Sequence, residues 1–150
     1  MGSELAQELA QLVDAAAVEL GRQPTELTAQ RPRPESWSKR EILGHLIDSA
    51  ANNHQRFVRA QQVDELDFPP YEQEAWVACQ RYEERDWHEL VALWVAYNRH
   101  LVHVLRVMPR SKLDTPCKVD WYGTPQTISL STVAEEYLTH MRHHLEQLTA

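Results

Sequence analysis

Apolar residues recur every three or four positions in four long stretches of the chain, a spacing that places them on one face of an α-helix. The stretches cover about residues 3–20, 38–61, 86–108 and 129–148. The seam of the first stretch consists of Leu5, Leu9, Leu12, Ala16 and Leu20. Four amphipathic helices bury their apolar faces most economically against one another. The pattern therefore predicts an all-α chain folded as an antiparallel four-helix bundle.

Three of the predicted helices begin with residues that cap helix N-termini. A capping box needs Ser, Thr or Asp before the helix and Glu or Gln three positions later, so that each side chain binds the other's backbone amide. The capping residues are Ser38 with Glu41, Asp86 with Glu89, and Ser129. These signals place the starts of the second, third and fourth helices.

Gly44 is the one residue of the second helix that disfavours a helix. Glycine inside a helix costs about 1 kcal/mol relative to alanine. We therefore expect a packing or access reason for a glycine directly before His45.

The connections between the helices differ in character. Three prolines exclude a continuous helix over residues 23–37, which we expect to be an ordered crossing. Residues 63–71 are acidic and contain two prolines, so they are predicted to be a loop. Residues 72–81 predict a short extra helix, anchored to the body by Trp76. That helix is either a surface turn with a buried Trp or a lid beside a pocket.

The segment before the last helix is irregular and short of helical signals. Residues 118–126 could form a small β-hairpin or an Ω-loop, with Gly123 and Pro125 turning the chain.

Composition and charge narrow the class of protein. The 150 residues suffice for a single domain with a real core, which we place at 1–150. The net charge of −7 argues against a nucleic-acid or anionic-membrane partner, which would need a basic face. The sequence has neither an apolar run long enough to span a membrane nor the order of a signal peptide, so we expect a cytoplasmic protein. Cys79 and Cys117 are far apart, and we expect free thiols.

The last helix places two histidines in its buried stripe. His140 and His144 are one turn apart and share the face that carries Val133 and Tyr137, whereas His143 falls on the flank. Buried ring nitrogens need partners. A divalent metal could accept one nitrogen from each ring. Alternatively, each ring hydrogen-bonds to a neighbour or lies at the end of the bundle.

The second helix offers a third imidazole. His45 lies at the edge of its apolar arc and would face the pair in the last helix if the two buried faces packed together. Three protein ligands with one open position describe a catalytic metal site, whereas a structural zinc site is normally closed by four. A metal there would lower the pKa of bound water toward about 7, or deprotonate a bound thiol.

His100 and His103 form a rival pair on the third helix. They lie off its apolar seam and have no third ligand nearby in the predicted arrangement. We therefore expect them to be surface residues.

Two stretches together resemble the DinB/YfiT-like metalloenzyme family. They are Trp37-Ser38-Lys39-Arg40-Glu41-Ile42-Leu43-Gly44-His45-Leu46-Ile47-Asp48-Ser49 and the late His140-Met141-Arg142-His143-His144-Leu145-Glu146-Gln147-Leu148. The similarity in helix order and length covers nearly the whole chain. It implies a four-helix bundle that binds a divalent metal, commonly zinc or nickel, with His45, His140 and His144 at the positions of the family's three His ligands. The family includes S-transferases that use a low-molecular-weight thiol such as bacillithiol or mycothiol, a mycothiol-dependent isomerase, and stress- or DNA-damage-induced members; many form dimers.

Four further residues are candidates for the site. Asp48, one turn after His45, could orient a ligand or accept a proton from metal-bound water, or could be a solvated surface carboxylate. Arg56 could grip a substrate carboxylate or form an intramolecular salt bridge. Asn52 points toward the same end of the helix, and Tyr137 either donates a hydrogen bond near the pocket or fills it.

The resulting hypothesis is a metal-dependent transferase or hydrolase whose three-His site activates water or a small thiol. Its partners would be a small-molecule substrate and a second copy of the chain. One alternative is a bundle that binds metal or ligand without turnover, associated with stress or DNA damage. Another is a structural helical dimer with buried histidines and no metal.

Overall fold

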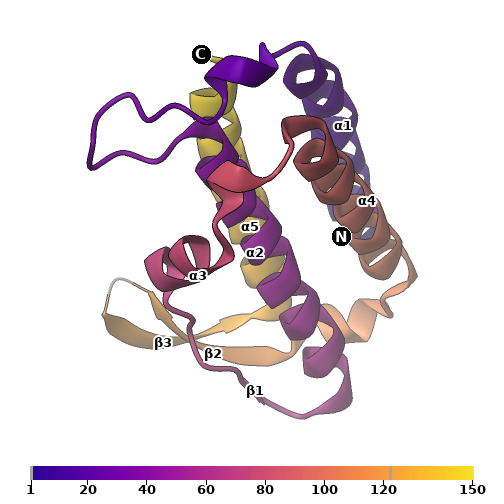
Figure 1. Cartoon of the computed structure of the whole chain (residues 1–150). Coiled ribbons are helices and arrows are strands. Elements are labelled where there is room, and N and C mark those ends of the chain that lie inside the picture. The colour runs from indigo at the N-terminus through magenta and orange to yellow at the C-terminus, as the bar shows by residue number, and fades with distance from the viewer. Residues whose placement is uncertain (1, 122) are drawn as a thin grey trace.

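The computed structural model describes residues 2–121 and 123–150, and it confirms the four-helix bundle (Figure 1). The long helices are α1 (Gly2–Gly21), α2 (Lys39–Arg59), α4 (Trp87–Val107) and α5 (Leu130–Thr149). Their apolar faces meet in one core whose largest fully buried side chains are Trp87, Trp94 and Phe57. Within the described residues, no helix combines the length and the apolar character needed to cross a membrane.

The order of the helices in space requires a long return of the chain. Helices α2 and α4 both run toward the end of the bundle that carries a small sheet, while α1 and α5 run away from it (Figure 1). After 21 residues of α2, which span about 31 Å, the chain must travel back before α4 can begin. Residues 60–86 make this return, and we call them the crossover segment. Their elements are η2 (Ala60–Gln62), β1 (Leu66–Asp67), α3 (Gln73–Gln80) and η3 (Tyr82–Glu84).

The predicted hairpin before α5 is present. Strands β2 (Pro116–Trp121) and β3 (Thr124–Ser129) pair in antiparallel fashion, and Gly123 in the turn has φ +73°. Pro125 lies in β3 opposite Asp120 instead of in the turn. Tyr122, which the hairpin prediction included, lies outside the described residues. Two short 3₁₀ turns complete the connections, η1 (Thr25–Leu27) and η4 (Arg110–Asp114).

Residues 63–71 are a loop, as predicted, apart from one short strand. Leu66 and Asp67 form β1, which adds to β2 in parallel, with Leu66 opposite Cys117. This pairing joins segments far apart in sequence, so the local composition could not reveal it.

The helix caps follow the predicted residues. At Ser38 the capping box is complete, with the Glu41 amide 3.2 Å from Ser38 Oγ and the Ser38 amide 3.0 Å from Glu41 Oε1. Asp86 accepts a hydrogen bond from the Glu89 amide at 3.0 Å, and Ser129 from the Thr132 amide at 3.2 Å. These bonds fix where α2, α4 and α5 begin.

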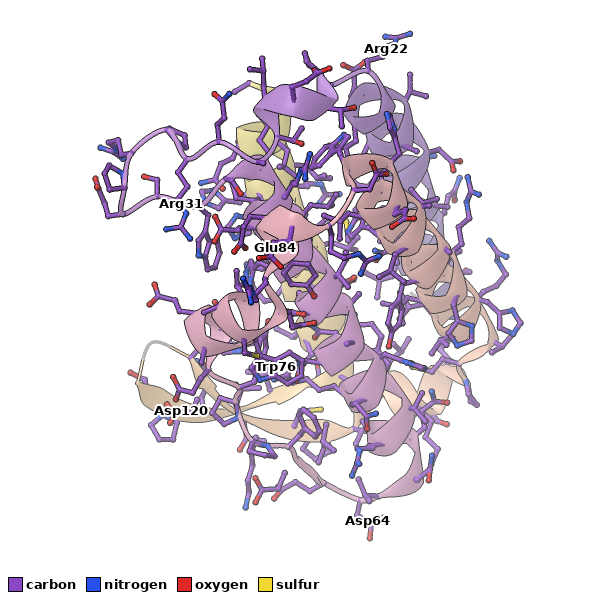
Figure 2. The ribbon with its side chains drawn as sticks, in the orientation of Figure 1. Arg22, Arg31, Asp64, Trp76, Glu84 and Asp120 are labelled. Carbon is purple, nitrogen blue, oxygen red and sulfur yellow. The ribbon has the colours of Figure 1, made fainter. Side chains whose placement is uncertain are left out.

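The short helix α3 is anchored by a different residue from the one predicted. Trp76 is 38% exposed and contacts Tyr71, with the ring centroids 5.0 Å apart (Figure 2). Val77, one position later, is buried instead. In an eight-residue helix one step turns the side chain by about 100°, which is enough to exchange the buried and exposed positions.

Gly44 has the packing reason that its position suggested. A Cβ atom at residue 44 would lie 2.1 Å from Cδ2 of Tyr82, and the ring carbon Cγ would be nearly as close. The aromatic ring of η3 therefore lies directly against the backbone of α2, where no other residue type leaves room for it.

Candidate metal centre

Three imidazoles from two helices converge inside the bundle. His45 comes from α2, and His140 and His144 come from α5. The ring centroids of His45 lie 4.9 Å from those of both partners, and the His140 and His144 centroids are 4.6 Å apart. The Nε2 atoms of His45 and His140 are 3.0 Å apart. The two helices, packed antiparallel, thus bring together the residues that the sequence placed on their buried faces.

Burial keeps these rings neutral at pH 7. It lowers the pKa of His45 to about 3, and the positive charge that His140 and His144 would carry lowers it further. Burial, followed by the neighbouring imidazoles, also lowers the pKa of His140 to about 4, and burial lowers the pKa of His144. A metal binds the unprotonated form of imidazole. The three lone pairs are therefore available without competition from protons near neutral pH.

The hydrogen bonds around the rings select the nitrogen that faces inward. Nδ1 of His144 lies 2.8 Å from Oε1 of Gln147, an acceptor, so Nδ1 carries the hydrogen and Nε2 holds the lone pair. Nδ1 of His45 is buried and has no partner among the described residues, while its ring lies 5.1 Å from that of Trp37. The sequence analysis gave Gln147 no role, although its position three residues after His144 was the available signal.

The donor set fits a divalent ion. Two nitrogens bound to one tetrahedral zinc at roughly 2.0–2.1 Å lie about 3.3 Å apart, close to the 3.0 Å between the Nε2 atoms of His45 and His140. One ligand atom from each of the three rings lies within 4.8 Å of the others. Three neutral nitrogen donors suit zinc, nickel and related transition metals.

A cavity of about 600 Å³ adjoins the cluster, and His140 forms part of its wall. Helix α2 contributes Ser49, Asn53 and Arg56 to the wall. Helix α5 adds further residues beside His140, and the crossover segment and the hairpin contribute the rest, mostly apolar and aromatic side chains. The size is that of a pocket for a small molecule. A metal held by the three rings would therefore have substrate-sized space on its His140 side.

Comparison with known proteins gives the family. The model of the DinB superfamily matches residues 3–148. The chain belongs to the DinB superfamily. Over 119 residues it is 25% identical to YfiT of Bacillus subtilis (strain 168), in an alignment that covers 78% of this chain and 65% of the relative. The chain thus spans 65% of the length of that relative.

The solved structure of YfiT from Bacillus subtilis superposes on this DinB-superfamily chain with a TM-score of 0.85 at 20% sequence identity. The superposition covers 99% of this chain and 83% of YfiT. YfiT is described as a probable metal-dependent hydrolase with an unusual four-helix bundle topology. The likeness establishes the fold of the present chain.

Asp48 is neither a solvated surface carboxylate nor a partner of the three rings. It is buried; its Oδ1 accepts hydrogen bonds from the Tyr82 hydroxyl at 2.6 Å and from Gln80 Nε2 at 2.8 Å. Its Oδ2 has no partner among the described residues. Burial raises the pKa of this carboxyl, and the two hydrogen bonds oppose the rise. Asp48 thus links α2 to the crossover segment.

The other three candidates divide between the cavity and the core. Arg56 lines the cavity, and no carboxylate in the described chain forms an ion pair with it. Tyr137 also lines the cavity, and its hydroxyl donates to Asn98 Oδ1 at 2.5 Å. Asn52 is buried and donates to the Asp48 carbonyl, whereas its neighbour Asn53 reaches the cavity wall.

The remaining histidines are not members of the cluster. His100 and His103 are exposed, as predicted. His143 is also exposed, although its ring lies beside that of His144, with the centroids 5.1 Å apart. His54 on α2 lies beside the rival pair, with its ring centroid 5.1 Å from that of His100. Its Nδ1 lies 2.9 Å from the Tyr97 hydroxyl. In residues 2–121 and 123–150, the cluster of His45, His140 and His144 is the group of three that meets metal-ligand spacing.

Proposed function

We propose that the protein is a divalent-metal-dependent hydrolase in which His45, His140 and His144 hold the ion. One observation carries the proposal: three neutral imidazoles, one buried and two half-buried, bring their ligand atoms to one point, beside a cavity large enough for a small substrate. Three protein ligands are the usual number in a catalytic zinc site, which leaves a position for water or substrate. The likeness to YfiT, a probable metal-dependent hydrolase, supports the same reaction class.

The chain's own residues would orient and shield the reaction. A bound metal supplies Lewis acidity and lowers the pKa of water to about 7. Gln147 holds His144 in the tautomer whose Nε2 faces inward. Trp37 covers one side of His45, and His140 leaves the cluster accessible from the cavity. We assign Asp48 a positioning role, because its hydrogen bonds hold Tyr82 and Gln80 against α2.

Thiol transfer at the same site is the second candidate, favoured by one observation. None of the carboxylates in the described part of the chain hydrogen-bonds to the three rings, so no carboxylate is held at the cluster as a general base. A thiol needs none, because coordination to a metal deprotonates it outright. Metal-dependent turnover that requires a small thiol, and fails with water alone, would select this candidate over the hydrolase. Binding of metal without turnover in either assay would select the non-catalytic alternative.

Metal analysis of protein purified without an affinity tag tests the shared premise. We expect about one equivalent of metal per chain and loss of most of it in His45→Ala, His140→Ala and His144→Ala. His143→Ala is the matched control, because His143 adjoins His144 on α5 but is exposed outside the cluster. Less than about half an equivalent in the wild type, with no further loss in His140→Ala, would refute the metal site. Hydrolysis of a panel of esters and amides by the loaded protein, lost in the same three variants, would establish the activity.

A further inference from the structure

Arg56 is a half-buried cation without a counter-ion. Its guanidinium lies over the ring of Phe68, 5.1 Å from the centroid, and burial lowers its pKa. Arg56 takes part in none of the ion pairs within the described chain. Its side chain also forms no hydrogen bond to the described residues. Removing a charge from water is costly unless an opposite charge or hydrogen bonds replace the water.

The titratable groups that act on the pKa of this guanidinium do not supply a negative charge at pH 7. They are the Tyr71 hydroxyl and the Cys117 thiol. Burial raises the pKa of Tyr71 to about 12 and that of Cys117 to about 11, so both are neutral at pH 7. The carboxylates that reach the cavity, on Glu72, Asp120 and Glu136, are exposed at its rim, where Asp120 is labelled in Figure 2. The positive charge of Arg56 therefore has no ion-pair partner among the described residues.

Tyr71 offers a second donor beside Arg56. Its ring lines the cavity, and its hydroxyl makes no hydrogen bond to the rest of the described chain. Apolar and aromatic side chains make up much of the surrounding wall, among them Phe68, Trp121 and Val133. A guanidinium and a hydroxyl that both lack partners among the described residues, beside these apolar side chains, match the anionic end of a small molecule with an apolar body.

We propose that Arg56 and Tyr71 bind the carboxylate of the substrate, so that the metal centre acts on small organic acids. This inference rests on the proposed function for the role of the metal. His140 stands in the wall of the same cavity, so an acid bound at Arg56 extends toward the cluster. The planar fork of arginine pairs with the two oxygens of a carboxylate. Arg56 and Tyr71 would thus select the substrate by its carboxylate, and the reaction would take place at another group of the same molecule.

Calorimetric titration of the metal-free protein tests the subsite separately from catalysis. The probes are 3-phenylpropionate and its neutral analogue 3-phenylpropanamide, which differ only in the charged end. We expect the acid to bind at least about tenfold more tightly than the amide. Arg56→Gln should weaken acid binding about tenfold or more and leave amide binding unchanged. Tyr71→Phe should weaken acid binding about threefold to tenfold. The affinity of Arg56→Lys for the acid should lie between those of Arg56→Gln and the wild type.

Arg59→Gln is the matched control. Arg59 lies one turn further along α2 and also approaches the Phe68 ring, at 5.7 Å, but it is exposed and does not line the cavity. Its removal should leave the affinity for the acid unchanged. Equal affinities for acid and amide, or equal effects of Arg56→Gln and Arg59→Gln in folded protein, would overturn the proposal. Tighter binding of inorganic phosphate than of the acid would overturn the carboxylate assignment.

The same variants separate this inference from the proposed function. Arg56→Gln should keep about one equivalent of metal per chain, and metal-free His140→Ala should keep its affinity for 3-phenylpropionate within about threefold. A protein that binds the acid but no metal would leave the subsite standing and refute the hydrolase. A protein that binds metal but shows no preference for the acid would refute the carboxylate subsite and leave the metal site of the proposed function standing.

Discussion

Replacement of Gly44 by alanine tests how the crossover segment supports the helix that carries His45. The added methyl group would lie 2.1 Å from Cδ2 of Tyr82, well inside the contact distance of two carbon atoms. The overlap involves the base of the ring as well as its edge, so rotation of the side chain alone does not relieve it. Either α2 or η3 must shift. We expect Tyr82 to move away from α2.

The magnitude follows from three contributions. Overpacking of a core costs about 1–3 kcal/mol. Displacement of Tyr82 also lengthens the 2.6 Å hydrogen bond from its hydroxyl to buried Asp48, which costs about 1 kcal/mol while Gln80 still donates to the same oxygen. Alanine returns about 1 kcal/mol through its higher helix propensity. The net loss in the free energy of unfolding is about 2 kcal/mol, or roughly 4–8 °C in Tm for a chain of this size.

Urea unfolding of the metal-free protein, followed by circular dichroism, measures this loss. Gly21→Ala is the control, because nothing lies within 4 Å of a Cβ at that helix end, and we expect a change below about 0.5 kcal/mol. The pair Tyr82→Ala and Gly44→Ala/Tyr82→Ala completes a double-mutant cycle. Without the ring, the alanine at residue 44 should be neutral or mildly stabilising.

Two outcomes would refute this reasoning. The first is a Gly44→Ala protein as stable as the wild type. The second is the same loss from Gly44→Ala whether or not Tyr82 is present, because the cost would then arise from something other than the ring.

Two other predictions concern the cluster itself. Gln147→Ala removes the acceptor that orients His144, so metal affinity should fall about tenfold, as measured by competition with a chromophoric chelator. Glu146→Ala, at an exposed neighbouring position, should leave the metal affinity unchanged. Equal effects of the two substitutions would contradict the role of Gln147. The stability of the metal-free protein should depend on pH, because the native pKa values of His45 and His140, about 3 and about 4, lie below the unfolded value near 6.5. The unfolded chain then binds more protons below pH 6.5, so the contribution of each ring is complete above that pH and declines by up to about 1.4 kcal/mol per pH unit as the pH falls toward 4. Urea unfolding at pH 7, 6 and 5 should show that the free energy of unfolding depends less on pH in His45→Gln than in the wild type. The dependence should be unchanged in His143→Gln. Identical slopes in all three proteins would contradict the prediction.

Local sequence signals determine most of the bundle. Each long helix has its own apolar period, and the caps at Ser38, Asp86 and Ser129 depend on residues within three positions. His140 and His144 share a face for the same local reason. The approach of His45 to that pair required one further assumption, that the two buried faces meet, and the distances support it.

Features that depend on distant residues could not be predicted. Strand β1 exists because Leu66 lies beside Cys117, a contact that no local pattern encodes. The sequence left open whether Arg56 forms a salt bridge, since this depends on every carboxylate that could reach it. Asp48 was assigned to either the site or the surface, yet it is buried against Tyr82, whose position is set by the crossover segment.

The crossover segment connects the topology of the bundle to its site. Because α2 and α4 run in the same direction, the chain has to pass back along α2 between them (Figure 1). On this path Tyr82 fills the space left by Gly44, directly beside His45 in the sequence, and its hydroxyl fixes Asp48 one turn later. Earlier on the same path, Phe68 and Tyr71 form the wall of the cavity around Arg56. An antiparallel α2–α4 pair could be joined by a short loop and would lose both the support behind His45 and the wall of the cavity. The long return is therefore the element that gives a pair of helices bearing three histidines a walled cavity.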